Sequence, residues 1–339
     1  MARIALDAMG GDHAPKATVA GALLALAELD PVHSIQLVGQ TAVVEAQLRE
    51  LLDGELSSHA SHRSRLSIVE APDVIEMTDK PSAAVRGKPN SSMAIGLRLQ
   101  TEGASDAFVS AGSTGAQMAA SMVILRLHAG LKRPAIVTLF PSARQPVAVL
   151  DSGANVDCSP DELVQFARVG SVYAQCVLGR SNPAVGLLSI GEEAEKGNAV
   201  TKEAHMLLRQ SGLNFIGNVE GRDLPKGGTD HHEIDVVVCD GFVGNVLLKF
   251  YEGIAPFMID TLRAAGVDGD QLADGLKHLD YSQYGGAPLL GVKGVSIIAH
   301  GKSSPRAIMN AIKVAVQAVS SGMNDLMGQR LGNDKDNAA

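Results

Sequence analysis

Short runs of valine, isoleucine and alanine alternate with longer stretches of helical period along almost the whole chain. The short runs end in loops of glycine, serine, asparagine and aspartate, as strands do before a tight turn. Such alternation predicts βαβ units and a mostly parallel sheet flanked by helices. The predicted strands cover residues 4–6, 35–38, 66–69, 107–110, 136–139, 147–150, 185–189, 214–217, 234–239 and 295–299.

The predicted helices cover residues 15–29, 42–52, 92–102, 114–127, 160–178, 198–210, 244–265 and 305–322. Pro15, Pro160 and Pro305 suit a first helical turn, while Ser92 and Ser159 suit caps. No repeat or low-complexity linker divides the chain, so we predict one three-layer α/β/α domain, Rossmann-like, over residues 1–330. Within it, segment 254–294 either protrudes as a partner-binding region or is an ordinary excursion between sheet elements. Polar residues 331–339 lack periodicity and predict a flexible tail.

Composition narrows the class of protein. Hydrophobic residues make up 45% of the 339 residues and aromatic residues only 3%, which suits valine-rich strands under alanine and leucine helices. A net charge of −8 without a long basic block argues against nucleic-acid binding. Three cysteines without CxxC spacing suggest neither disulfides nor zinc. The N-terminal apolar run is too short for a signal peptide, so we expect a cytoplasmic protein; no uninterrupted apolar run suits a spanning helix, although attachment to a membrane surface remains open.

Six strand-end loops combine glycine with small polar side chains. In a parallel sheet these loops share one edge, where free helix N-termini favour anions. We therefore predict that they converge on one crevice built to hold phosphate and an acyl group. The loops read DAMGGDHAP (7–15), SAGSTGA (110–116), DSGANVDCSP (151–160), SIGEEAEKGN (189–198), CDGFVGN (239–245) and AHGKSS (299–304).

Standard cofactor and nucleophile motifs are missing from these loops. No GxGxxG follows a strand, Ser296 stands where a P-loop before Gly301 needs glycine, and residues 112–115 read GSTG rather than GxSxG. His231, His232 and Glu233 lack metal-site spacing, so we read them as a solvated loop and predict no metal and no cofactor. For Cys158 and Cys239 we favour packing, with an acyl-cysteine intermediate as a minority alternative.

Nine ordered segments make the chain resemble the bacterial phosphate acyltransferases of phospholipid synthesis, the PlsX family. They are IALDAMGGDHAP (4–15), KPSAAVRGKPNSSM (80–93), SAGSTGA, RPAI (133–136), LDSGANVDC (150–158), GEEAEKGN (191–198), VVVCDGFVGNVLLK (236–249), YGGAPLLG (284–291) and HG (300–301). The resemblance departs at Ser113, where many relatives have asparagine, and after Gly301, so Lys302 receives no family role. The TDHHEI stretch (229–234) looks like a local elaboration.

The resemblance implies transfer of a long-chain acyl group from acyl carrier protein to inorganic phosphate, and acyl phosphate then feeds glycerol-3-phosphate acylation. It also implies a homodimer with a fold akin to phosphate acetyltransferases and isocitrate-type dehydrogenases, held peripherally at the inner membrane. Two alternatives stay open: short-chain phosphate acetyl or butyryl transfer from coenzyme A, and a noncatalytic membrane-bound scaffold.

A reaction between phosphate and a thioester needs positioning more than an enzyme nucleophile. We hypothesise that His13 polarises the thioester carbonyl or moves a proton, and that aspartates orient neighbouring groups. The catalytic set is His13, Asp7, Arg86, Lys88 and Asp240, with Asp151 as a further orienting carboxylate. The phosphate cradle is Gly10, Gly11, Asp12, Gly112, Ser113, Thr114 and Gly115. The acyl and pantetheine set is Asn155, Asp157, Gly241, Phe242, Asn245, His300 and Gly301.

Docking of an acidic carrier to a net-negative enzyme requires a local basic patch. One predicted patch contains Arg126, Lys132 and Arg133, and another contains Arg263 and Lys277, with ordinary solvated faces as the alternative. Ile254, Phe257 and Met258 could contact a membrane, with burial in the core as the alternative.

Overall fold

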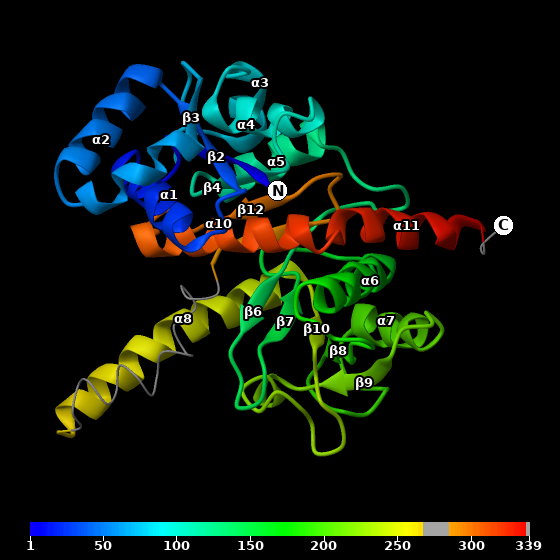
Figure 1. Cartoon of the computed structure of the whole chain (residues 1–339). Coiled ribbons are helices and arrows are strands. Elements are labelled where there is room, and N and C mark those ends of the chain that lie inside the picture. The colour runs from blue at the N-terminus through cyan, green and yellow to red at the C-terminus, as the bar shows by residue number, and fades with distance from the viewer. Residues whose placement is uncertain (267–284, 337–339) are drawn as a thin grey trace. The chain divides into compact units, whose positions relative to one another are not determined.

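A computed structural model describes residues 1–266 and 285–336 and divides the chain into two compact units (Figure 1). The first unit contains residues 1–129 and the C-terminal part from residue 284, and the second contains residues 130–283. The chain thus leaves the first unit once and returns to it late, so no linker composition marks the boundary. That the units act as one catalytic domain stays a prediction.

The first unit is built on a sheet whose strands β1 (Arg3–Asp7), β2 (Ser34–Gly39), β3 (Leu66–Glu70), β4 (Ala107–Ser110) and β12 (Ser296–Ile298) are parallel. Their spatial order is β3-β2-β1-β4-β12, with antiparallel β11 (Ala287–Leu290) beside β12. β1, β4 and β12 are adjacent, and Leu6 pairs with Val109. The polar residues after these three strands therefore share one edge.

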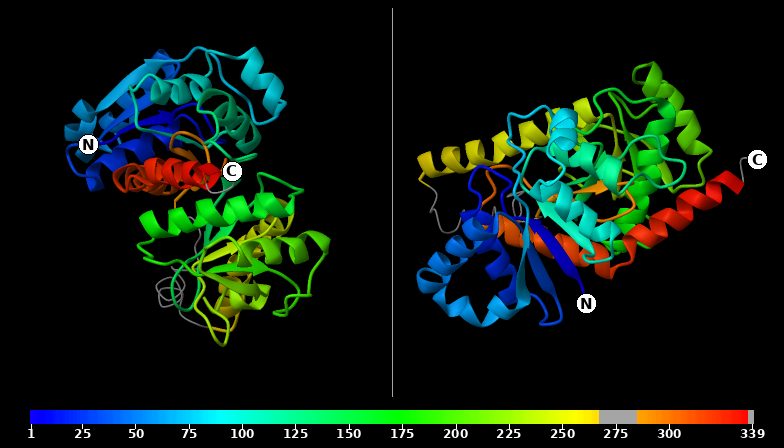
Figure 2. Two further views of the ribbon diagram at one scale, coloured as in Figure 1. Left: turned by 90° about the vertical axis from the view of Figure 1, so that its right-hand side faces the viewer. Right: turned by 90° about the horizontal axis from the view of Figure 1, so that it is seen from above.

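Helices cover this sheet because their apolar residues are buried against it (Figure 2). α1 and α10 pack closely: a Cβ on Gly21 would lie 2.6 Å from the Ile308 Cβ. The helical elements are α1 (Lys16–Glu28), α2 (Thr41–Asp53), η1 (Ser57–Arg65), α3 (Pro81–Gly87), α4 (Ser92–Thr101), α5 (Thr114–Ile124), α10 (Pro305–Ser320) and α11 (Met323–Asp336).

The second unit has a sheet in the order β6-β7-β10-β8-β9, parallel except for the pair β6 and β7. Its buried cluster includes Phe140, Val149 and Val237, with Tyr251 of α8 packed against it. The strands of this sheet are β6 (Thr138–Phe140), β7 (Val147–Leu150), β8 (Val185–Leu188), β9 (Phe215–Val219) and β10 (Val236–Val238). β5 (Ala135–Ile136) precedes β6 in the chain and is not part of this sheet. The helical elements are α6 (Pro160–Cys176), α7 (Ala199–Arg209), η2 (Gly221–Asp223) and α8 (Gly241–Ala264).

The predicted α/β class, with mostly parallel sheets flanked by helices, is confirmed. The strand predicted at 136–139 is two strands, β5 and β6, and α3, β11 and α11 were not predicted. α11 continues to Asp336, so part of the segment predicted as a tail is helical. Of segment 254–294, residues 267–284 lie outside the described residues.

Candidate functional site

Three loops of the first unit meet at the carboxyl edge of its sheet. The backbone N–H of Asp12 donates to the Gly301 carbonyl at 2.8 Å, and Ala299 N donates to the Ser110 carbonyl at 2.8 Å. A Cβ on Gly11, whose φ is +106°, would lie 3.1 Å from both Ala111 Cβ and the Gly301 oxygen. The loops after β1, β4 and β12 are therefore in contact, as their glycine content predicts.

The carboxylate of Asp7 fixes two of these loops through hydrogen bonds. Ser110 Oγ donates to Asp7 Oδ2 at 2.7 Å and accepts from Gly112 N at 3.0 Å. Met9 N donates to Asp7 Oδ1 at 3.1 Å, and the Gly10 N–H and the Ser92 hydroxyl also face this carboxylate. Asp7 thus positions the backbone of the loops that follow β1 and β4.

Burial raises the pKa of Asp7, because the charged carboxylate loses its water, and the hydrogen bonds from Ser92, Ser110 and the backbone only partly offset this. Ser110 and Ser92 were not predicted as site residues. Ser92 was predicted to cap α4, but Ser91 does so by accepting from Ala94 N. The parallel placement of Ser110 and Asp7 at adjacent strand ends was the signal that could have identified Ser110.

Not every glycine amide in these loops is available to an anion. The N–H groups of Gly10 and Gly112 point to Asp7 and Ser110, so both glycines serve the fold of the loop rather than a ligand. Close approach requires glycine at position 10, since a Cβ there would lie 2.5 Å from Asp7 Oδ2. The N–H groups of these two glycines therefore do not belong to the predicted phosphate cradle, which is left with other N–H donors.

The first turn of α5 offers those donors. Ser113 is its N-cap residue, yet its side chain accepts no capping hydrogen bond, and within the described part of the chain the N–H groups of Thr114, Gly115 and Ala116 have no acceptor. By contrast Ser91, Ser159 and Ser304 each cap their own helix. An open helix N-terminus attracts anions through its free N–H groups and its dipole.

The predicted basic groups lie beside α5, on and next to α3. A Cβ on Gly115 would lie 2.9 Å from Pro81 Cγ, so α3 packs on the first turn of α5. Arg86 is exposed, and its Nε donates to the Ser82 carbonyl. Lys88 Nζ instead pairs with Asp79 at 2.6 Å and donates to the Val74 carbonyl, so its charge is already neutralised.

The remaining predicted residues of this unit lie on the same edge. His13 and Asp12 are exposed, and the His13 carbonyl accepts from Ala17 N in the first turn of α1. His300 is exposed, and its Nδ1 accepts from Lys302 N at 3.2 Å. That bond leaves Nε2 as the protonated nitrogen of the neutral ring.

In the second unit, Asp151 organises the loops after β7 and β10 in the same manner. Its carboxylate accepts from Ile136 N at 2.9 Å, from Asn155 N at 2.6 Å and from Asn155 Nδ2 at 2.9 Å. Gly241 N donates to the Asn155 carbonyl, and a Cβ on Gly241 would lie 2.6 Å from Asp151 Oδ2. Burial raises the pKa of Asp151, against the opposing hydrogen bonds from Ile136, Ala154 and Asn155.

The acyl and pantetheine residues predicted in this unit have mixed surroundings. Asn155 is buried and uses Nδ2 on Asp151 and Pro134, whereas Asp157, Phe242 and Asn245 are exposed. Asp240 caps α8 by accepting from Val243 N at 2.8 Å. Through these contacts Asn155 supports the loop after β7, and Asp240 supports the start of α8. The prediction that the loops of both units share one crevice stays a prediction.

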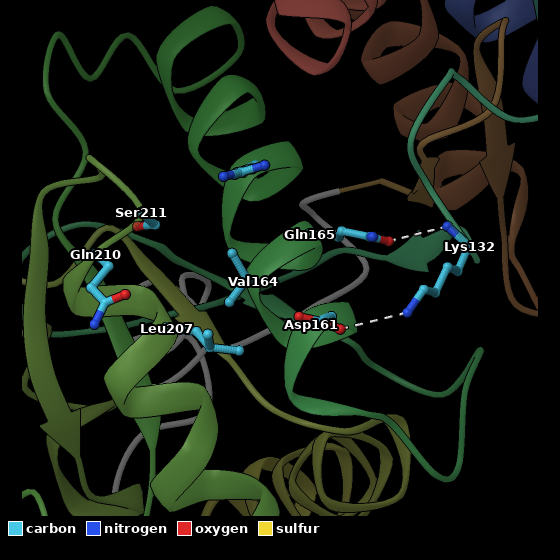
Figure 3. Close-up of a pocket in the computed structure, with 8 residues that line it drawn as sticks. Lys132, Asp161, Val164, Gln165, Leu207, Gln210 and Ser211 are labelled. Carbon is cyan, nitrogen blue, oxygen red and sulfur yellow. Dashed lines mark hydrogen bonds and ion pairs between the residues drawn. The ribbon is translucent and has the colours of Figure 1, made fainter. Parts of the chain in front are cut away.

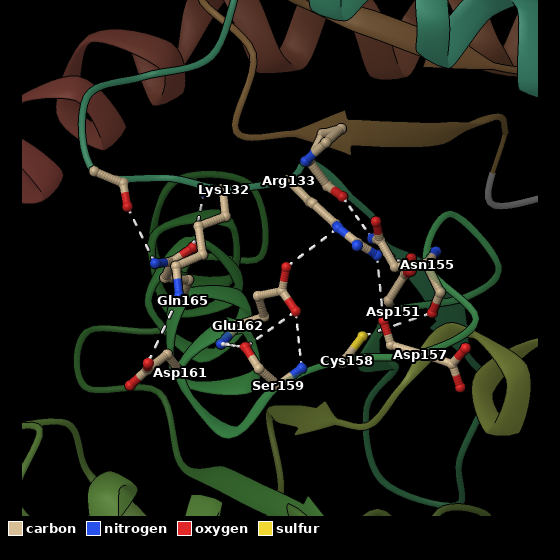
Figure 4. A network of polar contacts seen from close by, with 12 residues as sticks. Lys132, Arg133, Asp151, Asn155, Asp157, Cys158, Ser159, Asp161, Glu162 and Gln165 are labelled. Carbon is tan, nitrogen blue, oxygen red and sulfur yellow. Dashed lines mark hydrogen bonds and ion pairs between the residues drawn. The ribbon is translucent and has the colours of Figure 1, made fainter.

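A second polar network surrounds the start of α6 (Figure 4). Ser159 and Glu162 form a capping box, and Arg133 pairs with buried Glu162 at 3.2 Å. Cys158 Sγ lies 3.6 Å from the Asn155 carbonyl, and burial raises its pKa to about 12, with further contributions from nearby carboxylates. Burial also raises the pKa of Cys239. Neither thiol suits an acyl intermediate, since the nucleophile is the thiolate.

A cavity of about 370 Å³ lies between α6 and α7 and contains none of the residues predicted for catalysis, phosphate binding or acyl binding (Figure 3). Val164 and Leu207 form its apolar part. Lys132 at its rim pairs with Asp161 at 3.6 Å.

His231 and His232 are exposed, and their backbone N–H groups close a turn by donating to Thr229 Oγ1. Within residues 1–266 and 285–336, no group of three or more His, Cys, Asp and Glu residues could hold a metal ion.

Solved structures place the fold. A phosphotransacetylase from Streptococcus pyogenes matches with a TM-score of 0.62 and 17% identity, covering 94% of each chain. EutD phosphotransacetylase from Staphylococcus aureus matches with a TM-score of 0.60 and 15% identity over the same shares. At such identities the likeness shows the fold alone: a mostly parallel α/β architecture of Rossmann-like type.

Sequence comparison identifies the family. The family model described as "Fatty acid synthesis protein" matches residues 2–326. A phosphate acyltransferase from Desulforamulus reducens is 48% identical, covering 99% of both chains, and one from Heliobacterium modesticaldum is 48% identical, covering 94% of both. The chain belongs to this fatty acid synthesis protein family, as the nine segments predict, and its relatives are named as acyltransferase enzymes.

Proposed function

We propose that the protein is a phosphate acyltransferase that transfers a long-chain acyl group from acyl carrier protein to inorganic phosphate and so supplies acyl phosphate for phospholipid synthesis. The names of relatives at 44–48% identity support the phosphate acyltransferase activity. The family description supports a role in fatty-acid metabolism. The carrier protein as donor is the finer part of the proposal.

The observation that carries the proposal is the open N-terminus of α5. It lies at the sheet edge where the loops after β1 and β12 meet, with exposed Arg86 on α3, which packs against it. Free N–H groups of Thr114, Gly115 and Ala116 would hold two or three phosphate oxygens. Asp7 contributes by fixing the adjoining backbone rather than by touching the anion, because its carboxylate is buried and would repel phosphate.

In the proposed reaction a phosphate oxygen attacks the thioester carbonyl carbon. The resulting oxyanion collapses as the C–S bond breaks, which gives acyl phosphate and the carrier thiolate, and the thiolate then takes a proton. No covalent intermediate with the enzyme is needed. Fixing phosphate beside the thioester contributes several kcal/mol, and one amide donor to the oxyanion contributes roughly 3 kcal/mol. Exposed His13 and the protonated Nε2 of His300 are available as donors to the carbonyl oxygen.

The activity is tested by incubating the purified protein with phosphate and one donor at a time, and by trapping acyl phosphate with hydroxylamine. We expect turnover with palmitoyl-loaded acyl carrier protein. Turnover only with acetyl- or butyryl-coenzyme A would instead support the short-chain alternative, and no product with any donor would support a scaffold.

The phosphate position is tested separately with Ser113→Asp, which places a carboxylate on the open amides of α5. We expect the KM for phosphate to rise at least about tenfold, or ~1.4 kcal/mol, while the new cap stabilises the fold by about 1 kcal/mol. Ser113→Asn, which caps without a charge, is the matched control and should raise KM less. An unchanged KM in Ser113→Asp would place phosphate elsewhere.

We further propose that the protein is cytoplasmic, forms a homodimer and attaches peripherally to the inner face of the membrane, near the glycerol-3-phosphate acyltransferase that consumes its product. Among the described residues, α8 is the one helix long and apolar enough to cross a bilayer by length and composition. Its Leu247, Leu248 and Tyr251 pack on the core, whereas Phe250 and Phe257 are exposed, which favours surface contact. Co-sedimentation of Phe250→Ser and Phe257→Ser with vesicles tests the membrane attachment, and light scattering of the same variants tests the dimer. If neither measurement differs from wild type, α8 is not the contact surface.

A further inference from the structure

The predicted basic cluster of Arg126, Lys132 and Arg133 is not a single patch. Lys132 pairs with Asp161 and Arg133 with Glu162, so both charges are satisfied within the second unit. Arg126 lies in the first unit, just after α5, and its carbonyl accepts from Lys293 N at 2.8 Å. Both Arg126 and Lys293 are exposed, and no carboxylate of the described chain lies within ion-pair distance of either.

Arg126 adopts an unusual backbone conformation. Its φ is 65°, and it is the only non-glycine residue with positive φ among those described. Its N–H donates to the Ser121 carbonyl while its C=O accepts from Lys293, so hydrogen bonds on both sides hold it there. The left-handed region costs a side chain roughly 1–2 kcal/mol, and glycine would avoid that cost. An arginine at this position suggests that its side chain serves a purpose.

The face of α5 between this position and the phosphate site is apolar. The helix carries no charged side chain. Met118, Ala119 and Met122 are half-buried along one face, and Val123 is 69% exposed at its end. Methionine side chains adapt to varied flexible ligands. The face therefore runs from the open amides to an exposed valine beside two free cations.

From this arrangement we infer that Val123, Arg126 and Lys293 form the docking surface for acyl carrier protein, whose pantetheine arm then follows α5 to the phosphate site. The inference rests on the proposed function. The carrier is acidic, so the two free cations complement it, and Val123 offers an apolar contact. The 11 residues of α5 span about 16 Å, and a pantetheine arm, similar in length to four or five extended residues, reaches roughly 16 Å.

The test measures binding of fluorescently labelled acyl carrier protein by anisotropy, and acyl-phosphate formation from palmitoyl-carrier and from palmitoyl-coenzyme A. We expect Arg126→Glu with Lys293→Glu to weaken carrier binding and raise the carrier KM at least about tenfold, with less salt dependence. Turnover of palmitoyl-coenzyme A, which lacks the acidic protein, should stay within twofold of wild type.

Two further variants separate docking from folding. Arg126→Gly should lose carrier affinity while its unfolding midpoint stays equal or rises, since glycine adopts the positive φ freely. Arg49→Glu is the control, because it reverses the charge of an exposed residue on α2. This helix connects β2 to β3, the strand at the end of the strand order opposite β12, so carrier affinity and turnover should not change. Unchanged carrier affinity in the double variant would overturn the inference. Absence of acyl phosphate from every donor in the wild type would instead refute the proposed function, while the binding measurement would still decide the docking surface.

Discussion

Replacing Asp7 with asparagine should separate activity from stability. Asp7 accepts from Ser110 Oγ at 2.7 Å and from Met9 N at 3.1 Å, and Ser110 in turn accepts from Gly112 N. An asparagine of the same shape can keep one oxygen on Met9. Its NH₂ group then faces the Ser110 hydroxyl, which must become an acceptor and compete with the Gly112 bond.

The loss in activity follows from that competition. One buried N–H or O–H is left poorly paired, which costs about 1.4–2.7 kcal/mol of loop positioning and corresponds to a ten- to hundredfold lower kcat/KM for phosphate. The loss should appear with carrier and coenzyme A donors alike, because the loops after β1 and β4 hold the phosphate side of the reaction.

Stability should change less than activity, because a second effect opposes the cost of the poorly paired donor. Burial raises the pKa of Asp7 in the folded state, so the folded protein binds this proton more tightly than the unfolded chain does. Stability from this group is complete at low pH and falls as pH rises from the unfolded value through the folded pKa. Asp7→Asn removes that loss, which offsets the cost of the poorly paired donor, so urea unfolding near neutral pH should show a midpoint close to that of the wild type.

Asp106 is the matched control, since it lies before β4 at the opposite edge of the same sheet. It pairs with Arg3 at 2.8 Å, and although burial alone would raise its pKa, hydrogen bonds from the Arg3 side chain and backbone lower it. Asp106→Asn should therefore cost about 1 kcal/mol of stability, lost in the wild type on acidification, and leave kcat/KM unchanged. Full activity in Asp7→Asn, or equal stability losses in both variants, would refute the assignment.

Three further outcomes test the same geometry. Gly10→Ala should lower both stability, by about 1–3 kcal/mol, and activity, because its methyl group would meet Asp7; chemical unfolding and turnover measure this, and a neutral variant would contradict the close approach. Arg86→Ala should keep the melting temperature and raise the KM for phosphate about tenfold, while equal values would remove Arg86 from the site. Cys158 should resist alkylation at pH 8 in the folded protein, as mapped by mass spectrometry, because its pKa is raised to about 12, and rapid native labelling would count against that burial.

Local pattern predicted most of the fold because strands and helices follow from apolar spacing. All the predicted helices and most of the strands exist, with ends shifted by a few residues. The misses have physical causes. α3 is short and mostly exposed, so it has no apolar period to detect. The helix predicted from residue 244 begins at Gly241, because Asp240 caps it.

The site was predictable to the level of the loop but not of the atom. Strand-end glycines located the loops around Asp7 and Asp151. Lys88 was predicted as a member of the catalytic set, but whether its ammonium group faces solvent or Asp79 depends on tertiary contacts that spacing does not encode. The division into two units was equally hidden, since the chain crosses between them at residues 129–130 and near 284 without a change in composition.

Glycine in a phosphate-site loop can serve two different purposes, and the two are distinguishable by what each amide already bonds. Gly10 and Gly112 bring their N–H groups to an internal carboxylate and an internal serine. Gly115 leaves its N–H free at the start of α5, and its lack of a side chain leaves room for Pro81. A methyl group at position 115 would therefore press on α3 without disturbing Asp7. We expect Gly115→Ala to raise the KM for phosphate with little change in stability, whereas Gly10→Ala loses both; the reverse ranking in paired unfolding and KM measurements would show that the anion binds at the β1 loop and not at α5.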